Sequence, residues 1–353
     1  MVSNFSASAL FFTGGNMVIN DPGFVVGPLA RFFGAILNYL FDFANGFMTY
    51  NTLGVAIVLL TLFTRVIMLP LAIKTQKSMV AMQQLNPEMM KIRKKYEGDK
   101  SNEAKQKMGA EMQALYAKNK VNPLGGCLPL LIQMPIFIAL NFIMQQSYRY
   151  VTEIGLVFDR ISSEILTMLD VMDGSEYLQL VGPHFEAKIP NNMLNAGTLN
   201  AGVAGDIETI VSRFSPAEWA NFIADMPVEM HAAMHELVAQ KDALEMFFGV
   251  NLGQLSGTSF PGIIIPILAG ITTFLASYFM TKLSSSMAQD AMQKQMQKVM
   301  LYMMPFMLGF FTIQMAAGVG VYWITSSIFQ FVQQMILNKI YMRPGAQATQ
   351  SAK

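Results

Sequence analysis

An arginine lies within a long apolar run of the sequence, where a charge is costly. The run 51–73 (NTLGVAIVLLTLFTRVIMLPLAI) contains Arg65 as its only charged residue. As a helix it would extend about 35 Å, against a bilayer hydrocarbon core of about 30 Å. A charge at the bilayer centre costs about 2.5–3.5 kcal/mol on insertion scales. We therefore expect Arg65 to mark a functional site. Because the other apolar runs contain no acidic residue, water is its expected partner.

Polar residues recur at helical spacing around this arginine and in the other apolar runs. Thr61 precedes Arg65 by one helical turn. A single stripe follows the spacing i, i+4, i+7, i+11, and consists of Trp323, Ser327, Gln330 and Gln334. Such residues either form interhelical hydrogen bonds or line a hydrophilic cavity, and their combination with an arginine favours the cavity. The candidate groove residues are Arg65, Thr61, Gln133, Asn141, Gln314, Tyr322, Trp323, Ser327 and Gln330.

Other candidate chemistry is weak. His231 and His235 have the i, i+4 spacing of zinc ligands on a helix. Their sequence, HAAMHE, is not the HExxH motif, and the nearest third ligand is the distant His184, so a solvated helix face is the preferred interpretation. The single cysteine, Cys127, excludes an intramolecular disulfide. With no phosphate-binding loop or catalytic triad in the sequence, we predict no cofactor, no metal and no enzymatic activity.

The composition indicates an integral membrane protein. The chain has 353 residues, of which 53% are hydrophobic and 13% charged, with a net charge of +1. This balance argues against direct nucleic-acid binding. The fold class predicted is an all-α integral membrane protein with five transmembrane helices around a hydrophilic groove. The predicted spans are 51–73, 127–147, 261–281, 299–316 and 318–338.

The distribution of basic residues predicts the orientation of these spans. The cytoplasmic segments would be 74–126, 282–298 and 339–353, which together contain 17 of the 24 Lys and Arg residues. The opposite segments, 1–50 and 148–260, contain six basic residues and seventeen acidic ones. By the positive-inside rule, the N-terminus is expected outside and the C-terminus in the cytoplasm.

The segments on either side of the first span are predicted to be amphipathic. Within residues 31–48, four polar residues fall within about 60° of one helical face, which favours an interfacial helix on the outer surface. A short sixth span is the alternative. Segment 74–126 has two helical arms separated at Glu97–Gly98–Asp99, and Pro87 is expected to kink the first arm. This cytoplasmic hairpin contains apolar residues at helical spacing, among them Met79, Met82, Met89, Met108 and Met112.

Two interpretations of the hairpin methionines remain open together. They join the two arms, or they offer an adaptable surface to varied hydrophobic partners. The outer segment 148–260 is predicted to be a small folded insert rather than disordered, because it retains aromatic residues and periodicity. Within it, Ser215-Pro216-Ala217-Glu218 has the form of a capping box, and Trp219, Phe222 and Ile223 follow as an apolar face.

Three stretches closely resemble the YidC/Oxa/Alb family of membrane protein insertases, in particular its bacterial members. They are TLFTRVIMLPL around Arg65, VNPLGGCLPLLIQMPIFIAL at 121–140 and GVGVYWITSSIFQFVQQ at 318–334. The resemblance covers roughly 50–147 and 260–340. It implies a five-helix core enclosing a groove open to the cytoplasm and to lipid, with Arg65 inside and Thr61 and Trp323 in contact with substrates. The insert 148–260 departs from the family pattern.

The resemblance implies that the chain is a membrane protein insertase of the bacterial plasma membrane. Nascent membrane proteins would be its substrates, and the Sec translocon, the ribosome and the signal recognition particle receptor are candidate partners beside the lipid bilayer. A functional monomer is expected. A small-solute or anion channel or transporter is the alternative, with Arg65 selecting an anion, although no inverted repeat supports it. A scaffolding protein in which Arg65 stabilises a helix bundle is a third possibility.

Overall fold

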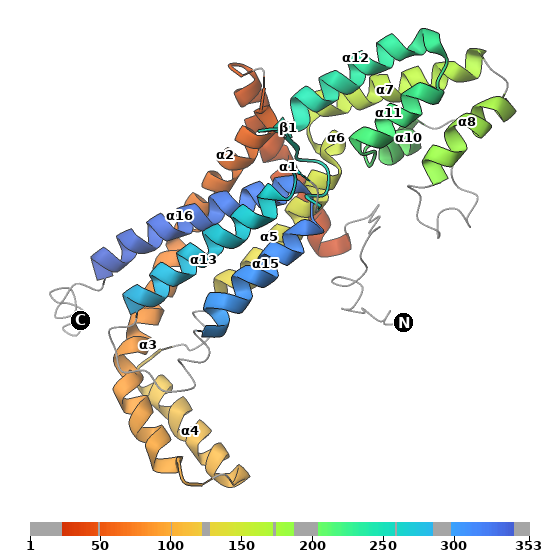
Figure 1. Ribbon diagram of the computed structural model, residues 1–353. Helices are drawn as coiled ribbons and strands as arrows, with labels where there is room; N and C mark the ends of the chain where they lie inside the picture. The colour runs from red at the N-terminus through yellow and green to blue at the C-terminus, as the bar shows by residue number, and fades with distance from the viewer. Residues whose placement is uncertain are drawn as a thin grey trace. The chain divides into compact units, whose positions relative to one another are not determined.

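The computed structural model describes residues 23–48, 50–99, 101–121, 128–171, 174–186, 204–257, 260–284 and 298–341 (Figure 1). These residues form two compact units. Unit 1 contains the described residues up to Leu60 and those within Ile136–Pro266 and Phe310–Tyr322. Unit 2 contains those within Thr61–Pro135, Ile267–Gly309 and Trp323–Lys353. Almost all regular structure is helical, which confirms the predicted all-α class. The described strands are β1 (Met246–Phe247) and β2 (Val250–Asn251), which pair antiparallel.

The first predicted span is not one helix. Helix α2 (Thr52–Ile67) ends before Met68, and α3 (Leu69–Tyr96) begins after it. The axis bends by 54° between Thr52–Ile67 and Leu69–Met82. Pro70, in the first turn of α3, explains the break, because its nitrogen cannot donate to the carbonyl one turn earlier and its ring crowds that carbonyl. The prediction of one continuous helix over 51–73 is therefore wrong at Met68.

The other four apolar runs coincide with helices whose bounds differ from those predicted. These are α5 (Leu128–Gln145), α13 (Ile264–Ser284), the π-helical turn η3 (Val299–Met303) with α15 (Met304–Ile313), and α16 (Ala317–Tyr341). The run 299–316 was expected to be helical to its end, but α15 stops at Ile313. Cys127 and the loops at 122–127 and 285–297 lie outside the described residues.

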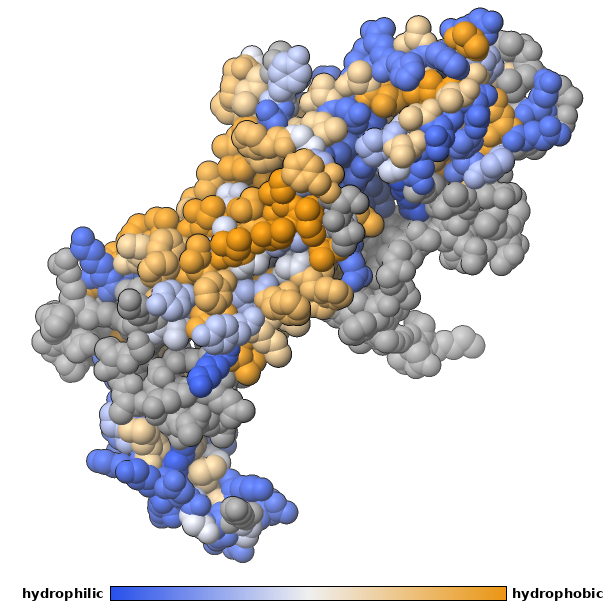
Figure 2. Space-filling model, in the orientation of Figure 1, coloured by the Kyte–Doolittle hydropathy of each residue, from blue (hydrophilic) through white to orange (hydrophobic). Residues whose placement is uncertain are grey.

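Only part of the described chain meets the length and hydropathy criteria for a membrane span. No single described helix is both long and apolar enough to cross a bilayer, whereas Thr52–Ile67 and Leu69–Met82 meet these criteria together as a bent pair. Shorter apolar helices are Leu131–Gln145, Ile264–Phe279 and Leu301–Ile313. Figure 2 shows predominantly hydrophobic surface on α13 and α15 and hydrophilic surface on α3 and α4. The number of spans remains a prediction.

The predicted amphipathic helix is part of a longer one, α1 (Gly23–Asn45). Its buried face repeats every three or four residues and consists of Ala30, Phe33, Leu37, Phe41 and Ala44. Aromatic side chains such as Tyr39 and Phe43 are exposed elsewhere on the helix. The predicted polar face turns partly toward protein, because Asn38 Oδ1 accepts a hydrogen bond of 2.7 Å from the Thr152 backbone N–H. Its position on a membrane surface remains a prediction.

Helices α3 and α4 (Asn102–Lys118) form the predicted hairpin (Figure 1). The Ser101 hydroxyl caps α4 by accepting from the Ala104 N–H. Glu111 on α4 accepts hydrogen bonds from Lys95 and Tyr96 on α3, which lowers its pKa, and the same contact with Glu111 raises the pKa of Lys95. Helix α3 is continuous through Pro87, and the kink expected there stays a prediction.

The described part of the insert is helical, in agreement with the prediction of a folded segment. It comprises α6 (Ser147–Tyr150), α7 (Thr152–Val171), α8 (Gly174–Glu186), α10 (Ala204–Val211), α11 (Pro216–Asp225) and α12 (Val228–Glu245). Its core is aromatic and includes the buried Phe158, Phe185, Phe214, Trp219 and Phe222. Both hydrogen bonds of the Ser215–Glu218 capping box are present, so that local prediction is confirmed.

A buried charge cluster joins the end of α12 to the rest of unit 1. Glu245 accepts hydrogen bonds from Ser147 (2.8 Å), Asn251 (3.1 Å) and Lys241 (3.3 Å). Burial alone would lower the pKa of Lys241, but the Glu245 and Asp242 carboxylates outweigh burial and raise it. Removing one member of such a cluster leaves an uncompensated buried charge, so the cluster ties the end of α12 firmly to α6 and β2.

Gly155 allows α7 to pass close to the backbone of α6, and this predicts the effect of adding one methyl group. A Cβ at Gly155 would lie 2.7 Å from the Tyr148 carbonyl oxygen, which is too close without a backbone shift. Gly155→Ala should therefore lower the free energy of unfolding by about 1–3 kcal/mol. Gly182→Ala in α8 is the matched control, because nothing lies within 4 Å of that position. Equal stability of the two variants in thermal unfolding would contradict the close approach.

A second prediction concerns Glu208 in α10. Burial, followed by its hydrogen bond to and repulsion from Asp159, raises the pKa of Glu208. A carboxyl whose pKa is higher in the folded than in the unfolded state stabilises the fold at pH values below its unfolded-state pKa. This stabilisation is lost as the pH rises through the folded-state pKa. Glu208→Gln should therefore raise the melting temperature at pH 7, and the gain should shrink as the pH approaches 4, roughly the unfolded value. A gain in melting temperature that grows as the pH falls would contradict the raised pKa of Glu208.

Candidate functional site

The side chain of Arg65 is held by a serine of α16 within unit 2. Arg65 Nε donates a hydrogen bond of 2.7 Å to Ser326 Oγ, and its Nη2 donates to the same oxygen. Arg65 is half-buried, whereas Ser326 is 3% exposed. The sequence did not predict this partner, a serine 261 positions away in the chain, and the expectation that water also contacts Arg65 stays a prediction.

The hydrogen bond to Ser326 orients the guanidinium group of Arg65 and does not cancel its charge. A serine oxygen is neutral, so the hydrogen bond fixes the direction of the side chain and retains the positive charge. Arg65 also lies in the last turn of α2, where the partial negative charge of the helix C-terminus favours a cation. Just beyond it, Pro70 interrupts the backbone hydrogen bonding. The arrangement is a fixed cation at the end of an apolar helix.

Trp323 and Ser327 contact a different helix. Trp323 Nε1 donates a hydrogen bond of 3.0 Å to Thr273 Oγ1 on α13, and Ser327 Oγ lies 3.4 Å from the same oxygen. The Thr273 hydroxyl in turn donates to the Ala269 carbonyl within α13. For these two members of the predicted stripe, the interhelical interpretation is the one that the hydrogen bonds support.

The nine predicted groove residues fall in both units. Unit 2 contains Arg65, Thr61, Gln133, Trp323, Ser327 and Gln330, and unit 1 contains Asn141, Gln314 and Tyr322. Thr61 is fully buried and Gln330 is exposed. Asn141 Oδ1 accepts from the Ala316 N–H at 3.4 Å, Gln314 is exposed beyond the end of α15, and Tyr322 is buried. The hydrophilic groove that would join all nine remains a prediction.

The hairpin methionines are all half-buried, namely Met79, Met82, Met89, Met108 and Met112. Tyr116 on α4 places its hydroxyl 3.9 Å from the sulfur of Met89 on α3, so at least this methionine joins the two arms. Half-burial leaves part of each side chain accessible. Their role in contacting partners stays a prediction.

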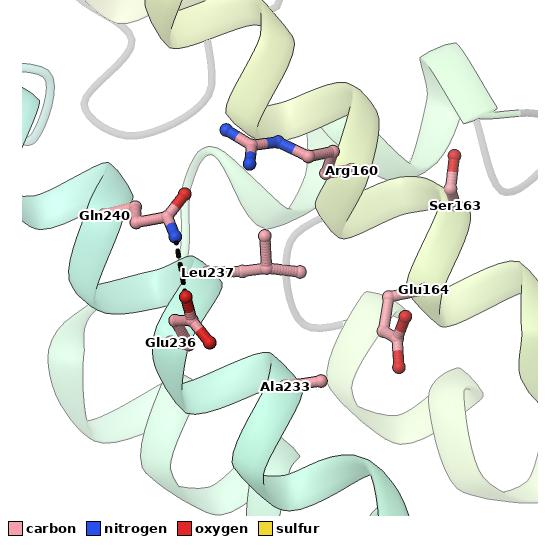
Figure 3. Close-up of a pocket in the computed structure, with 7 residues that line it drawn as sticks. All are labelled: Arg160, Ser163, Glu164, Ala233, Glu236, Leu237 and Gln240. Atoms are coloured by element: carbon pink, nitrogen blue, oxygen red, sulfur yellow. Dashed lines mark hydrogen bonds between the residues drawn. The ribbon is translucent and has the colours of Figure 1, made fainter.

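One cavity, of about 370 Å³, lies between α7 and α12 in the insert (Figure 3). Its lining includes Arg160 and Glu164 on α7 and Glu236 and Gln240 on α12. The polar groups bond along their own helices, since Gln240 donates to Glu236 and Arg160 donates to the Leu156 carbonyl.

His231 bonds the Met226 carbonyl. Among the described residues, no group of His, Cys, Asp or Glu is arranged to hold a metal ion.

Residues that sequence reasoning missed are those on the partner helices. Ser326 lies about 60° from Trp323 on the helical wheel, at the edge of the predicted stripe, so helical phase could have included it. Thr273 on α13 and Gln76 on α3 have no such signal, because their partners are far away in the chain. A pattern within one helix shows which residues share a face and leaves open which helix that face contacts.

Fold and site together define an all-helical protein with a fixed cation among apolar helices. The family to which it belongs follows from comparison with known proteins. A family described as "60Kd inner membrane protein" matches residues 43–186 and 222–344, about three quarters of the chain. The chain belongs to this family of bacterial inner membrane proteins, which confirms the resemblance found in the sequence.

Individual relatives carry the name "Membrane protein insertase YidC". The relative from Cupriavidus pinatubonensis is 44% identical over 111 residues, 31% of this chain and 19% of that protein. The relative from Oceanobacillus iheyensis is 48% identical over 87 residues, 25% of this chain and 34% of that protein. The relative from Fusobacterium nucleatum is 32% identical over 173 residues, 48% of this chain and 79% of that protein. The match thus spans about a fifth of the first relative, about a third of the second and most of the third.

The Arg65–Ser326 contact predicts a measurable coupling energy. In a double-mutant cycle with Arg65→Met and Ser326→Ala, we expect a coupling of about 0.6–2 kcal/mol, the range of interhelical hydrogen bonds in membranes. Ser327→Ala is the matched control, because the neighbouring serine faces Thr273 instead. Unfolding of the purified protein in detergent micelles provides the measurement. Equal coupling of Arg65 to both serines would contradict the assignment of Ser326 as its partner.

Proposed function

We propose that this chain is a membrane protein insertase. It moves short polar segments of nascent membrane proteins across the bilayer and releases their hydrophobic segments into lipid. Membership of the family and the names of the relatives support this activity. The observation that carries the mechanism is the fixed, charge-retaining position of Arg65 against Ser326. No nucleotide or cofactor takes part.

In the proposed mechanism, the charge of Arg65 acts on the polar segment of the substrate, and the lipid bilayer takes up its apolar segment. Arg65 attracts acidic residues of a translocating tail and holds them partway across, where a wet groove lowers the cost of transfer. The apolar segment of the substrate slides along α2 and α16 into lipid, where each Leu, Ile or Phe is favourable. For an acidic tail moving outward, the membrane potential adds about 2.3 kcal/mol per charge per 100 mV. Substrates should therefore have short tails that are not strongly basic.

The proposed topology follows the charge distribution of the sequence. The N-terminus and the insert are outside, and the α3–α4 hairpin and the C-terminus are in the cytoplasm of a bacterium. The Lys-rich hairpin, with its half-buried methionines, suits contact with emerging hydrophobic segments. The ribosome, the signal recognition particle receptor and the Sec translocon are proposed partners on this basis, and the insert is proposed to bind a partner outside the membrane.

The experiment that tests this function is reconstitution in liposomes with a single-span substrate that has an acidic N-terminal tail. Arg65→Lys should retain insertion because it keeps the charge. Arg65→Ala should lower the initial rate about tenfold, the effect of about 1.4 kcal/mol on a barrier. Arg160→Ala, which removes an exposed arginine of the insert, is the matched control and should insert at the wild-type rate.

Each alternative gives a different result in the same vesicles. If Arg65→Ala inserts the substrate as fast as the wild type, the insertase function stands and the electrostatic role of Arg65 is contradicted. Equal insertion rates for a basic-tailed and an acidic-tailed substrate would also contradict that electrostatic role. Flux of small anions without insertion would support the channel alternative and contradict the proposed function.

A further inference from the structure

Three amide side chains form a buried network between α3 and α16, entirely within unit 2. Gln76 Nε2 donates to Asn338 Oδ1 at 2.7 Å, and Gln334 Nε2 donates to Gln76 Oε1 at 2.7 Å. Gln334 Nε2 also lies 3.0 Å from Asn338 Oδ1, one turn away on α16. Gln76 and Asn338 are 2% and 5% exposed. Amides buried this deeply are costly unless paired, so burial of Gln76 depends on both residues of α16.

The network lies on the opposite side of the helix break from Arg65. Arg65 precedes Met68 and bonds Ser326, whereas Gln76 follows Met68 and bonds Asn338. The separation from Arg65 to Gln76 is eleven residues, or about 16 Å of helix, and that from Ser326 to Asn338 is twelve, or about 18 Å. The two sets of bonds are therefore nearly in register along α16. Helix α16 acts as a splint across the bend between α2 and α3.

The splint adds to the backbone hydrogen bonds that remain at the break, from the Met68 N–H to the Thr64 carbonyl and from the Ala72 N–H to the Met68 carbonyl, each of 3.0 Å. At Pro70 the backbone lacks the hydrogen bond that would hold the two helical segments in line. Beyond the network, α3 continues without interruption to Tyr96, and its most extensive packing is against α4. Whatever holds the first turns of α3 against α16 therefore sets the direction of the whole hairpin.

We propose that Gln76, Gln334 and Asn338 are positioning residues for insertion, forming an amide latch that holds the α3–α4 hairpin against α16. When the latch opens, α3 turns about the break at Met68 and the hairpin changes direction. This role rests on the proposed insertase function, because the hairpin is the part that would meet the substrate. The network shares Gln334 with the predicted polar stripe, whereas Gln76 and Asn338 lie outside the candidate groove residues.

The first arm of the test measures geometry in the full-length protein, without reference to activity. Spin labels are attached at Gln113→Cys on α4 and Met335→Cys on α16, both exposed positions, in a Cys127→Ser background. Pulsed electron paramagnetic resonance in lipid nanodiscs then reports the distribution of distances between them. Gln76→Leu should broaden this distribution, whereas the exchange Gln76→Asn with Asn338→Gln, which retains both amides, should restore the wild-type width.

Two further variants keep this arm decisive. Gln84→Leu removes an exposed amide from the same helix and should leave the distance distribution unchanged. If Gln76→Leu does not fold, the less buried Gln334→Leu takes its place and is expected to broaden the distribution in the same way. A distribution as narrow as that of the wild type in the folded latch variant would overturn the proposal.

The second arm measures insertion in liposomes with the same variants. Gln76→Leu should slow insertion by about threefold, the factor that one interhelical hydrogen bond in a membrane typically contributes. The amide exchange should recover the rate, which loss of general stability would not explain. A broadened distribution with an unchanged insertion rate would overturn the positioning role. Failure of the wild type to insert would contradict the proposed function, while the distance measurement would still decide whether the latch exists.

Discussion

The cost of placing one cation among apolar helices is the constraint on which the site depends. Arg65 can be held there because Ser326 takes two of its hydrogen bonds and the end of α2 supplies a favourable partial charge. Neither contact neutralises the guanidinium. A carboxylate in the place of Ser326 would hold the arginine more strongly and remove the charge that a translocating acidic tail could use. The hydrogen bonds to a neutral serine hold the arginine in place without a carboxylate at that position.

The polar side of α16 serves three neighbours in turn. Ser326 bonds Arg65 of α2, Trp323 and Ser327 meet Thr273 of α13, and farther along, Gln334 and Asn338 bond Gln76 of α3. Interhelical hydrogen bonds matter among apolar helices because hydrophobic burial alone does not distinguish one helix neighbour from another in lipid. One helix thereby fixes the arginine and connects both sides of the break at Met68.

The sequence predicted what local pattern determines and missed what depends on distant contacts. The Ser215–Glu218 capping box and the hairpin were predicted correctly, because capping residues and hydrophobic periodicity act within a few turns. The break at Met68 was missed although Pro70 indicates it, because the uninterrupted hydropathy of the run favoured a single helix. Ser326 was missed as the partner of Arg65, since no pattern within α16 specifies which helix it faces. For the same reason, the pattern within α16 did not show which residues of the stripe contact another helix and which are exposed.

The most direct test of the account is site-specific photo-cross-linking in native bacterial membranes during synthesis of an acidic-tailed substrate. A photoreactive residue at Gln330, the exposed member of the stripe, is compared with one at Gln240 on the insert. The account predicts an adduct with the translocating tail at position 330 and none at 240, and weaker cross-linking at 330 when Arg65 is replaced by alanine. Equal cross-linking at both positions, or an adduct at 330 that does not depend on Arg65, would contradict it.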